Sequence, residues 1–159
     1  KEEKKPELDI VADMPPVSLE TTDLSYRYDS QSAPVFSGLY LSVTPGESVA
    51  ITGTSGAGKT TLMKVLCGLF EPDSGKVLVN GTDIRQLGIN NYHRMIACVM
   101  QDDRLFSGSI RENICGFSEE MDEAWMIECA RASYIHDVIM KMPMGYETLI
   151  GELGEGLSG

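Results

Sequence analysis

The stretch "GTSGAGKTT", Gly53–Thr61, constrains the fold of this chain more than any other part of the sequence. It matches the pattern G-x-x-x-x-G-K-[ST], whose fixed positions here are Gly53, Gly58, Lys59 and Thr60. An apolar run that is partly β-branched precedes it, over 48–53, and a helical pattern follows it, over 59–69. A buried strand, a glycine-rich turn and a helix in this order predict an α/β domain with a phosphate-binding loop.

Each residue type in this loop suits the binding of a nucleoside triphosphate. Glycines let the backbone curl so that consecutive N–H groups point at phosphate oxygens, and the positive end of the following helix faces the same anion. Lys59 adds a mobile charge for the β- and γ-phosphates, and the Thr60 hydroxyl is placed to ligate Mg²⁺. A chance match of a glycine-rich turn is the alternative, but spacing, composition and flanking pattern together disfavour it. We expect nucleotide contacts from the whole loop: Gly53, Thr54, Ser55, Gly56, Ala57, Gly58, Lys59, Thr60 and Thr61.

Composition excludes several other classes of protein. The 159 residues carry 24 acidic and 13 basic side chains, and the net charge of −11 argues against a nucleic-acid partner. The four cysteines form no C-x-x-C pair, which favours buried reduced thiols over a zinc site. No apolar run is long enough to span a bilayer, so we expect the chain as given to be soluble.

The pattern along the chain predicts three regions. Residues 1–16 are charged and contain prolines, as is typical of a linker from an upstream domain. Strand patterns dominate 17–108, and helical patterns dominate 109–159. The predicted strands cover 17–28 with a bend at 21–23, 35–43, 48–53, a segment within 72–81, and 94–100. The predicted helices cover 59–69, 110–113, 122–131 and 134–142.

Several stretches in a fixed order carry a resemblance to a known family. These are "VTPGESVAITGTSGAGKTTLMKVLCGLFEPDSGKVLVNGTDI", "IACVMQDDRLFSGSIRENI" and "GELGEGLSG". From Val17 onward the chain resembles the nucleotide-binding domain of an ABC transporter of the exporter type, most like the colicin V and bacteriocin peptide exporters. The resemblance implies an α/β P-loop NTPase core with an antiparallel β-subdomain and an α-helical subdomain, C-terminally incomplete. It also implies that residues 1–16 arrive from a transmembrane domain.

The resemblance extends the predicted site beyond the loop. Tyr28 matches the aromatic residue that stacks on adenine, with Tyr26 as the rival if the register slips. Gln101 matches the Q-loop glutamine, which ligates Mg²⁺ or orients the attacking water. The implied cofactors are ATP and Mg²⁺, with Thr60 and Gln101 as the metal ligands from this chain.

The last residues match the start of the family's signature motif. Ser158 and Gly159 would contact the ATP held by a partner's phosphate loop, so that two sites form across a head-to-tail dimer. Glu152 lies in a stretch that resembles the exporter X-loop, which senses the transmembrane domains. The implied partners are therefore a second nucleotide-binding domain and the transmembrane domains of the exporter.

The implied function is ATP-driven export of a peptide, at the cytoplasmic face of the bacterial inner membrane. The family's Walker B aspartate, catalytic glutamate and switch histidine would lie beyond Gly159, so we expect the 159 residues to bind ATP without hydrolysing it. Two alternatives are a soluble ABC-type ATPase and a non-catalytic nucleotide-binding module. The acidic charge and the exporter-like X-loop disfavour the first, and a glutamate directly after a Walker B aspartate would favour an enzyme over the second.

Overall fold

The computed structural model describes residues 16–101, 103–118 and 122–151. The chain divides into two compact units. Of the described residues, those up to Met100 form the first, here called the sheet unit, and those from Gln101 onward form the second, here called the helical unit. The division between the units falls after Met100, and the domain boundary at 108 stays a prediction.

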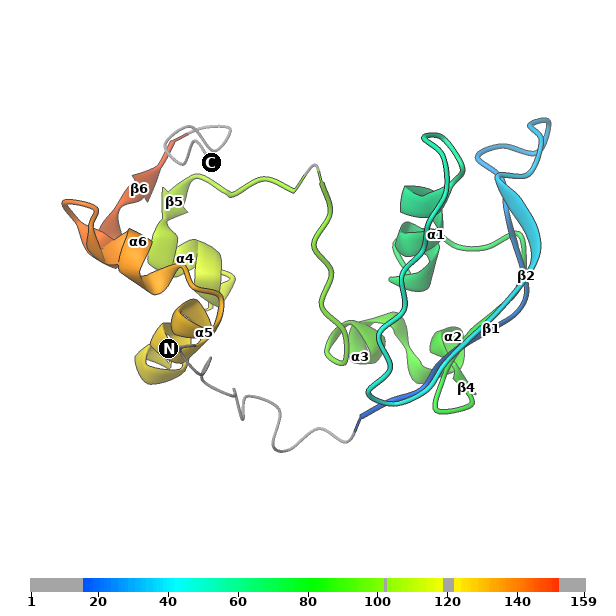
Figure 1. Cartoon of the computed structure of the whole chain (residues 1–159), viewed down its shortest axis with the longest axis horizontal. Coiled ribbons are helices and arrows are strands. Elements are labelled where there is room, and N and C mark those ends of the chain that lie inside the picture. Colours follow the sequence, from blue (N-terminus) through cyan, green and yellow to red (C-terminus); the bar gives the residue numbers. More distant parts are fainter. Residues whose placement is uncertain (1–15, 102, 119–121, 152–159) are drawn as a thin grey trace, which may run out of the picture. The chain divides into compact units, whose positions relative to one another are not determined.

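The sheet unit is built on a four-stranded antiparallel sheet with the order β2-β1-β3-β4 (Figure 1). Its strands are β1 Leu19–Tyr26, β2 Phe36–Val43, β3 Ser74–Val79 and β4 Thr82–Asp83. Strand β1 is central, with Leu19 opposite Val43 on one side and opposite Val79 on the other. Three of the predicted strands and the antiparallel β-subdomain are thus confirmed.

The bend that the sequence predicts in β1 is a break in its register. Pairing with both neighbours shifts after Thr21–Thr22, and Asp23 has a φ of 49°. Such an irregularity bends a strand and increases its twist. The carbonyl oxygens of Thr22 and Asp23 lie so close to Gly75 of β3 that a Cβ there would meet them at 2.5 and 2.4 Å.

Helix α1, Lys59–Leu66, packs on one face of this sheet. Its apolar side, Leu62, Val65 and Leu66, meets the buried sheet residues Leu24, Val77 and Val79. The short helices α2 Ile84–Leu87 and α3 Ile89–His93 complete the core through Ile84 and Tyr92. At the C-terminal end of α1, His93 Nε2 lies 2.9 Å from the carbonyl oxygen of Cys67.

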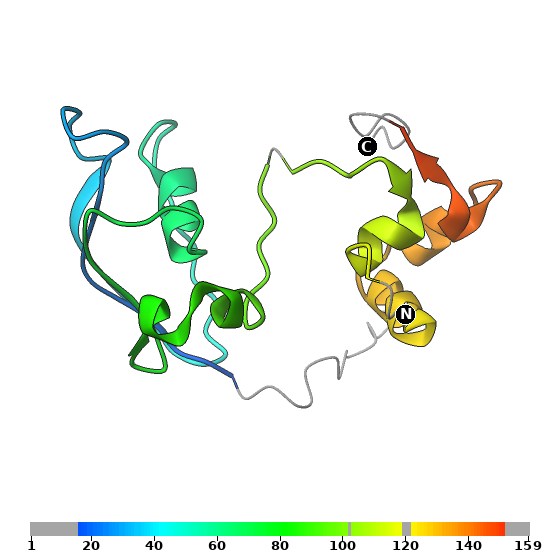
Figure 2. The same ribbon diagram turned by 180° about the vertical axis from the view of Figure 1, so that it is seen from behind.

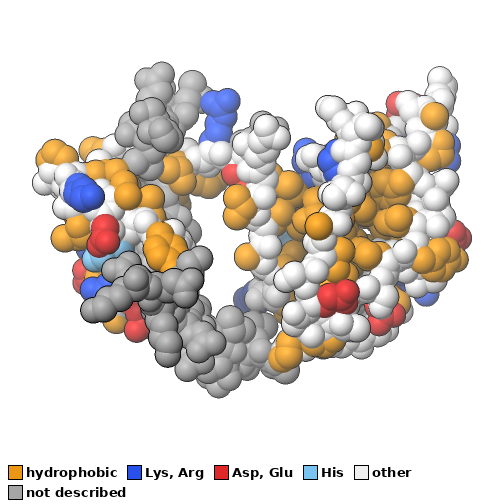
Figure 3. Space-filling view, viewed as in Figure 1, with side chains coloured by type: hydrophobic (Ala, Val, Ile, Leu, Met, Phe, Trp, Pro, Cys, Tyr) orange, Lys and Arg blue, Asp and Glu red, His pale blue; other side chains and the backbone are white. Residues whose placement is uncertain are grey.

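Two predicted strands are absent from the structure. Residues 48–53 and 94–100 have no strand assignment, and Val49, Ile51 and Val99 expose 46%, 37% and 92% of their surface. A strand exists only where a neighbour accepts its backbone hydrogen bonds. Within the described ranges no strand pairs with either segment. Figure 3 shows orange apolar side chains open to solvent on the face of the sheet unit that it presents.

The helical unit joins three helices to a two-stranded ribbon (Figure 2). Its elements are β5 Gly108–Ser109, α4 Ile110–Cys115, α5 Glu123–Ala132, α6 His136–Met140, the 3-10 turn η1 Gly145–Glu147 and β6 Leu149–Ile150. Strands β5 and β6 are antiparallel, with Gly108 opposite Ile150. The three predicted helices are confirmed, whereas the ribbon and η1 are not anticipated by the sequence patterns.

The helices of this unit enclose a small core and are joined at the surface by one arginine. The buried side chains are Ile110, Met126, Ala130, Ile139, Tyr146 and Ile150. On the outside, Arg111 of α4 forms ion pairs with Glu123 of α5 at 3.2 Å and with Glu147 of η1 at 2.6 Å. These pairs hold the pKa of the guanidinium above its ordinary value, because hydrogen bonds to Glu147 and Glu123 favour its charged form.

Candidate nucleotide site

The loop between residues 53 and 58 has the open, curled backbone that the glycine pattern predicts. Gly56 and Gly58 have φ angles of 79° and 86°, which side-chain-bearing residues rarely adopt. Ala57 N–H donates to the carbonyl of Thr54 at 3.2 Å and closes a turn. Residues 53–57 are exposed, so their backbone groups are accessible to a ligand.

Gly58 is fixed by space as well as by backbone conformation. It is the N-cap of α1, and its carbonyl accepts the N–H of Leu62 at 2.8 Å. A Cβ at this position would lie 2.6 Å from Cγ1 of Val35, just before β2. A side chain at this position would therefore require both a strained backbone and a displacement of Val35.

Lys59 lies across the mouth of the loop. Its Nζ donates to the carbonyl oxygens of Gly53 at 2.8 Å and Thr54 at 2.6 Å. These bonds hold the ammonium group beside the N-terminus of α1, where the helix dipole is positive. The Lys59 ammonium group and the positive N-terminus of α1 thus both lie beside the exposed loop 53–58. This arrangement can bind a phosphate group.

The two threonines after Lys59 face different surroundings. Thr60 is exposed in the first turn of α1, and its hydroxyl is the kind of hard oxygen ligand that Mg²⁺ accepts. Thr61 is 6% exposed, and its Oγ1 lies 2.7 Å from the hydroxyl of Tyr28. Across the described stretches, no group of three or more His, Cys, Asp or Glu residues is placed to hold a metal ion.

Tyr28 follows β1 and presents an open aromatic surface. Its residue exposure is 63%, and its ring meets Tyr26 and Phe70 edge-on, at centroid distances of 5.4 and 6.2 Å. Tyr26, the rival position, is half-buried and stacks on Phe70 at 5.5 Å with an interplanar angle of 11°. Burial, with smaller effects from Tyr28 and Asp73, raises the pKa of the Tyr26 phenol. Of the two tyrosines, only Tyr28 leaves most of its surface for a base to stack on.

The remaining predicted site residues lie outside the sheet unit. Gln101 is an exposed turn residue at the first position of the helical unit. Glu152, Ser158 and Gly159 lie outside the described residues, as do residues 1–15 of the predicted linker. The structure thus brings Tyr28 into contact with Thr61 at the end of the loop sequence, and all of the site assignments stay predictions.

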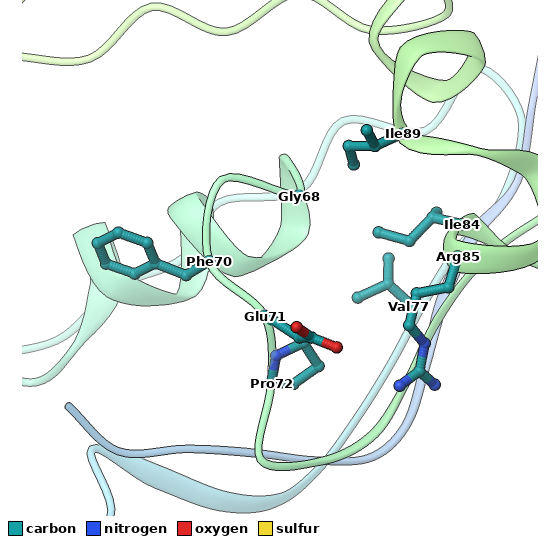
Figure 4. A pocket seen from close by; sticks show the side chains of 8 residues that line it. All are labelled: Gly68, Phe70, Glu71, Pro72, Val77, Ile84, Arg85 and Ile89. Carbon is teal, nitrogen blue, oxygen red and sulfur yellow. The ribbon is translucent and has the colours of Figure 1, made fainter. Parts of the chain in front are cut away.

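A pocket of about 360 Å³ opens on the sheet unit and is lined in part by residues that follow α1 (Figure 4). It is lined by Gly68, Phe70, Glu71, Pro72, Val77, Ile84, Arg85 and Ile89. Arg85 is fixed by Asp83, whose Oδ2 accepts from the guanidinium at 2.8 Å. The sequence patterns do not single out this pocket, because the apolar run 77–79 indicates a buried strand and not a cavity.

Comparison with known proteins agrees with the geometry of the loop. The family model described as "ABC transporter" matches residues 36–159. The chain is 92% identical over all 159 residues to the "Probable microcin-H47 secretion/processing ATP-binding protein MchF" and 87% identical to the "Colicin V secretion/processing ATP-binding protein CvaB", both of Escherichia coli. Each of these alignments covers 100% of this chain but only 23% of the relative. The chain therefore spans about a quarter of the length of these relatives.

A solved structure gives the same result for the fold. The structure titled "Structure of a bacterial Atm1-family ABC exporter with ATP bound" matches with a TM-score of 0.83 at 33% identity, over 91% of this chain and 25% of that chain. A phosphate-binding loop on an α/β core with a helical unit defines an ATP-binding domain of the ABC class. The chain belongs to the ABC transporter family, and within it resembles ATP-binding proteins of bacteriocin secretion. The predicted family and fold class are confirmed.

Proposed function

We propose that this chain is the ATP-binding part of an ABC exporter that moves a bacteriocin-type peptide across the bacterial inner membrane. The observation that carries the proposal is the exposed loop 53–58, with Lys59 held over it by the carbonyls of Gly53 and Thr54. The names of the two Escherichia coli relatives support the exported class, since both are secretion/processing ATP-binding proteins.

In this proposal ATP lies between the loop and the tyrosine. The triphosphate rests on the N–H groups of the loop, where Lys59 compensates its charge. Thr60 would be a ligand of Mg²⁺ held with the phosphates, and Gln101 is the second ligand that we propose from this chain. The adenine stacks on Tyr28, whose exposed ring offers a π surface to any purine.

We further propose that the 159 residues bind ATP without hydrolysing it. Hydrolysis needs a group that activates or orients water at the γ-phosphate. Among the residues assigned to the site, only Gln101 serves water, and an amide is no general base. The proposal is supported if the chain binds ATP saturably and releases no phosphate from it. It is contradicted if the chain releases phosphate steadily and the Lys59→Ala variant does not.

The proposed partners are a second copy of this domain and the transmembrane domains of the exporter. Ser158 and Gly159 would cover the ATP of the second copy in a head-to-tail dimer. The cytoplasmic face of the inner membrane is the proposed location. Within the described ranges, no helix combines the length and apolar character needed to cross a bilayer.

Calorimetric titration with Mg²⁺-ATP tests the binding proposal. We expect saturable binding that Lys59→Ala abolishes, because the substitution removes the positive charge held over the loop. Lys141→Ala is the matched control, since it removes an exposed lysine from the helical unit. Equal binding by the parent chain and by Lys59→Ala would reject the loop as the phosphate site, and a folded parent chain that binds no Mg²⁺-ATP would reject the proposed function.

A further inference from the structure

The hydroxyl groups of Tyr28 and Thr61 form a direct link between the predicted base site and the phosphate loop. Their oxygens lie 2.7 Å apart although the residues are 33 positions apart in the sequence. Thr61 belongs to the first turn of α1, two residues after Lys59. Tyr28 belongs to the loop after β1. The hydrogen bond therefore joins two elements that would otherwise meet the nucleotide separately.

Thr61 and Tyr28, the two partners of this hydrogen bond, differ in the conformational freedom of their side chains. Thr61 is 6% exposed and carried by a helix, so its hydroxyl is a fixed point. Tyr28 is mostly exposed, and an exposed side chain on a loop samples several rotamers unless something selects one. Edge-on contacts with Tyr26 and Phe70 limit the ring from one side, and the bond to Thr61 limits its tip.

The backbone next to Tyr28 is held as well. Arg27 N–H donates to Oδ2 of Asp73 at 2.6 Å, and the Arg27 side chain pairs with the same carboxylate. The base of the tyrosine is thus attached to the turn before β3, and its hydroxyl to the phosphate-loop helix. Because the Tyr28 ring is held both at its backbone and at its hydroxyl, its exposed face stays at one distance from the phosphate loop.

We propose that Thr61 is a positioning residue: its hydroxyl orients Tyr28 so that the base platform stands at a set separation from the phosphate loop. This inference rests on the proposed function, in which Tyr28 stacks on the base of a nucleotide whose phosphates occupy 53–61. A preorganised platform binds more tightly because the ligand does not have to order it. The expected contribution is that of one partly buried hydrogen bond, about three- to tenfold in affinity.

The test compares two ligands that share phosphates and differ in the base. Mg²⁺-ATP and Mg²⁺-tripolyphosphate are titrated into the 159-residue chain and its Thr61→Val, Thr61→Ser, Tyr28→Phe and double Thr61→Val/Tyr28→Phe variants. Thr61→Val keeps the shape and the backbone N–H but removes the hydroxyl. Tyr40→Phe is the matched control, since it removes the hydroxyl of another exposed tyrosine of the sheet unit.

We expect Thr61→Val and Tyr28→Phe each to weaken ATP binding about three- to tenfold, and the double variant to be no weaker than either. Tripolyphosphate binding should change less than the binding of ATP, and Thr61→Ser should restore ATP affinity. Equal losses for both ligands would place the Thr61 hydroxyl in the phosphate site and overturn the proposal. Fully additive losses, or no loss for Thr61→Val, would also overturn it.

A measurement without ligand separates this inference from the proposed function. With fluorotyrosine incorporated, the ¹⁹F resonance of Tyr28 is assigned by its disappearance in Tyr28→Phe. We expect Thr61→Val, but not Thr61→Ser, to shift this resonance. An unchanged resonance overturns the positioning role even where ATP binds. If the parent chain is folded but binds no ATP, the proposed function fails and the positioning role fails with it, whatever the spectrum shows.

Discussion

The buried hydroxyl of Tyr92 donates a hydrogen bond to the carbonyl oxygen of Leu66, at 2.5 Å. Tyr92 lies in α3 and is 1% exposed, and Leu66 is the last residue of α1. The carbonyls of a helix's last turn have no partner within the helix, so they need a donor from elsewhere. Helix α3 supplies that donor and thereby fixes the C-terminal end of the phosphate-loop helix.

Replacing Tyr92 with phenylalanine should destabilise the sheet unit. The substitution keeps the ring in the core but leaves a buried carbonyl without its donor, which costs about 1–3 kcal/mol. Urea denaturation followed by circular dichroism measures the change. Tyr134→Phe, at an exposed tyrosine of the helical unit, is the control and should change stability by less than about 0.5 kcal/mol. Equal effects of the two substitutions would contradict the capping role.

Tyr92 also predicts how stability falls at high pH. Burial, with a smaller effect of Cys67, raises the pKa of its phenol from 10.0 to about 12. The folded state therefore keeps a proton that the unfolded state loses, so this contribution is complete below pH 10.0 and is lost between pH 10.0 and about 12. Near-ultraviolet titration of tyrosinate should show one late-ionising tyrosine that is missing in Tyr92→Phe. A late phase that persists in the variant would assign it to another tyrosine.

Gly75 should not tolerate a side chain. Its φ is 84°, and a Cβ would lie 2.4 Å from the carbonyl oxygen of Asp23 in the irregular part of β1. Gly75→Ala should lower the free energy of unfolding by more than about 2 kcal/mol, since both backbone strain and the clash oppose it. Gly81→Ala is the control, because Gly81 has a φ of 77° but open space around it. Both variants carry the backbone strain, so the difference between the denaturation midpoints of Gly75→Ala and Gly81→Ala reports the clash alone. Equal midpoints would contradict the clash at Gly75.

Helix α4 depends on a reciprocal cap at its start. Ser109 Oγ accepts the N–H of Glu112 at 3.1 Å, and the Glu112 carboxylate accepts the N–H of Ser109 at 2.7 Å. Ser109→Ala should cost about 1 kcal/mol and speed amide exchange in α4. Ser107→Ala, two residues earlier and exposed, serves as the control. Unchanged exchange at α4 in Ser109→Ala would show that the cap contributes nothing measurable.

The sequence was most informative where function demands a fixed local pattern. The loop 53–58 and helix α1 follow from glycine spacing and from apolar residues on one helical face, so both were predictable. Helices α2 and α3 were not predicted; they have four and five residues, and Gly88 separates them. Their ends are instead set by the Asp83 side chain, which accepts the N–H of Arg85, and by Gly88 between them.

The predicted strands over 48–53 and 94–100 show where local pattern fails. An apolar, β-branched run indicates burial but does not say which strand will pair with it. The contacts of Tyr28 were missed for a related reason. Its neighbours Thr61 and Phe70 come from distant parts of the chain, and only the packing of α1 on the sheet brings them together.

Side chains from outside helix α1 form hydrogen-bond contacts near both of its ends. At its first turn Tyr28 holds Thr61, and beyond its last turn the ring of His93 holds the carbonyl of Cys67. Its eight residues make a rod about 12 Å long. The helix therefore ties the residues that follow the loop 53–58 to α3: any shift of α1 along its axis would strain the Tyr28–Thr61 contact at one end and the His93–Cys67 contact at the other.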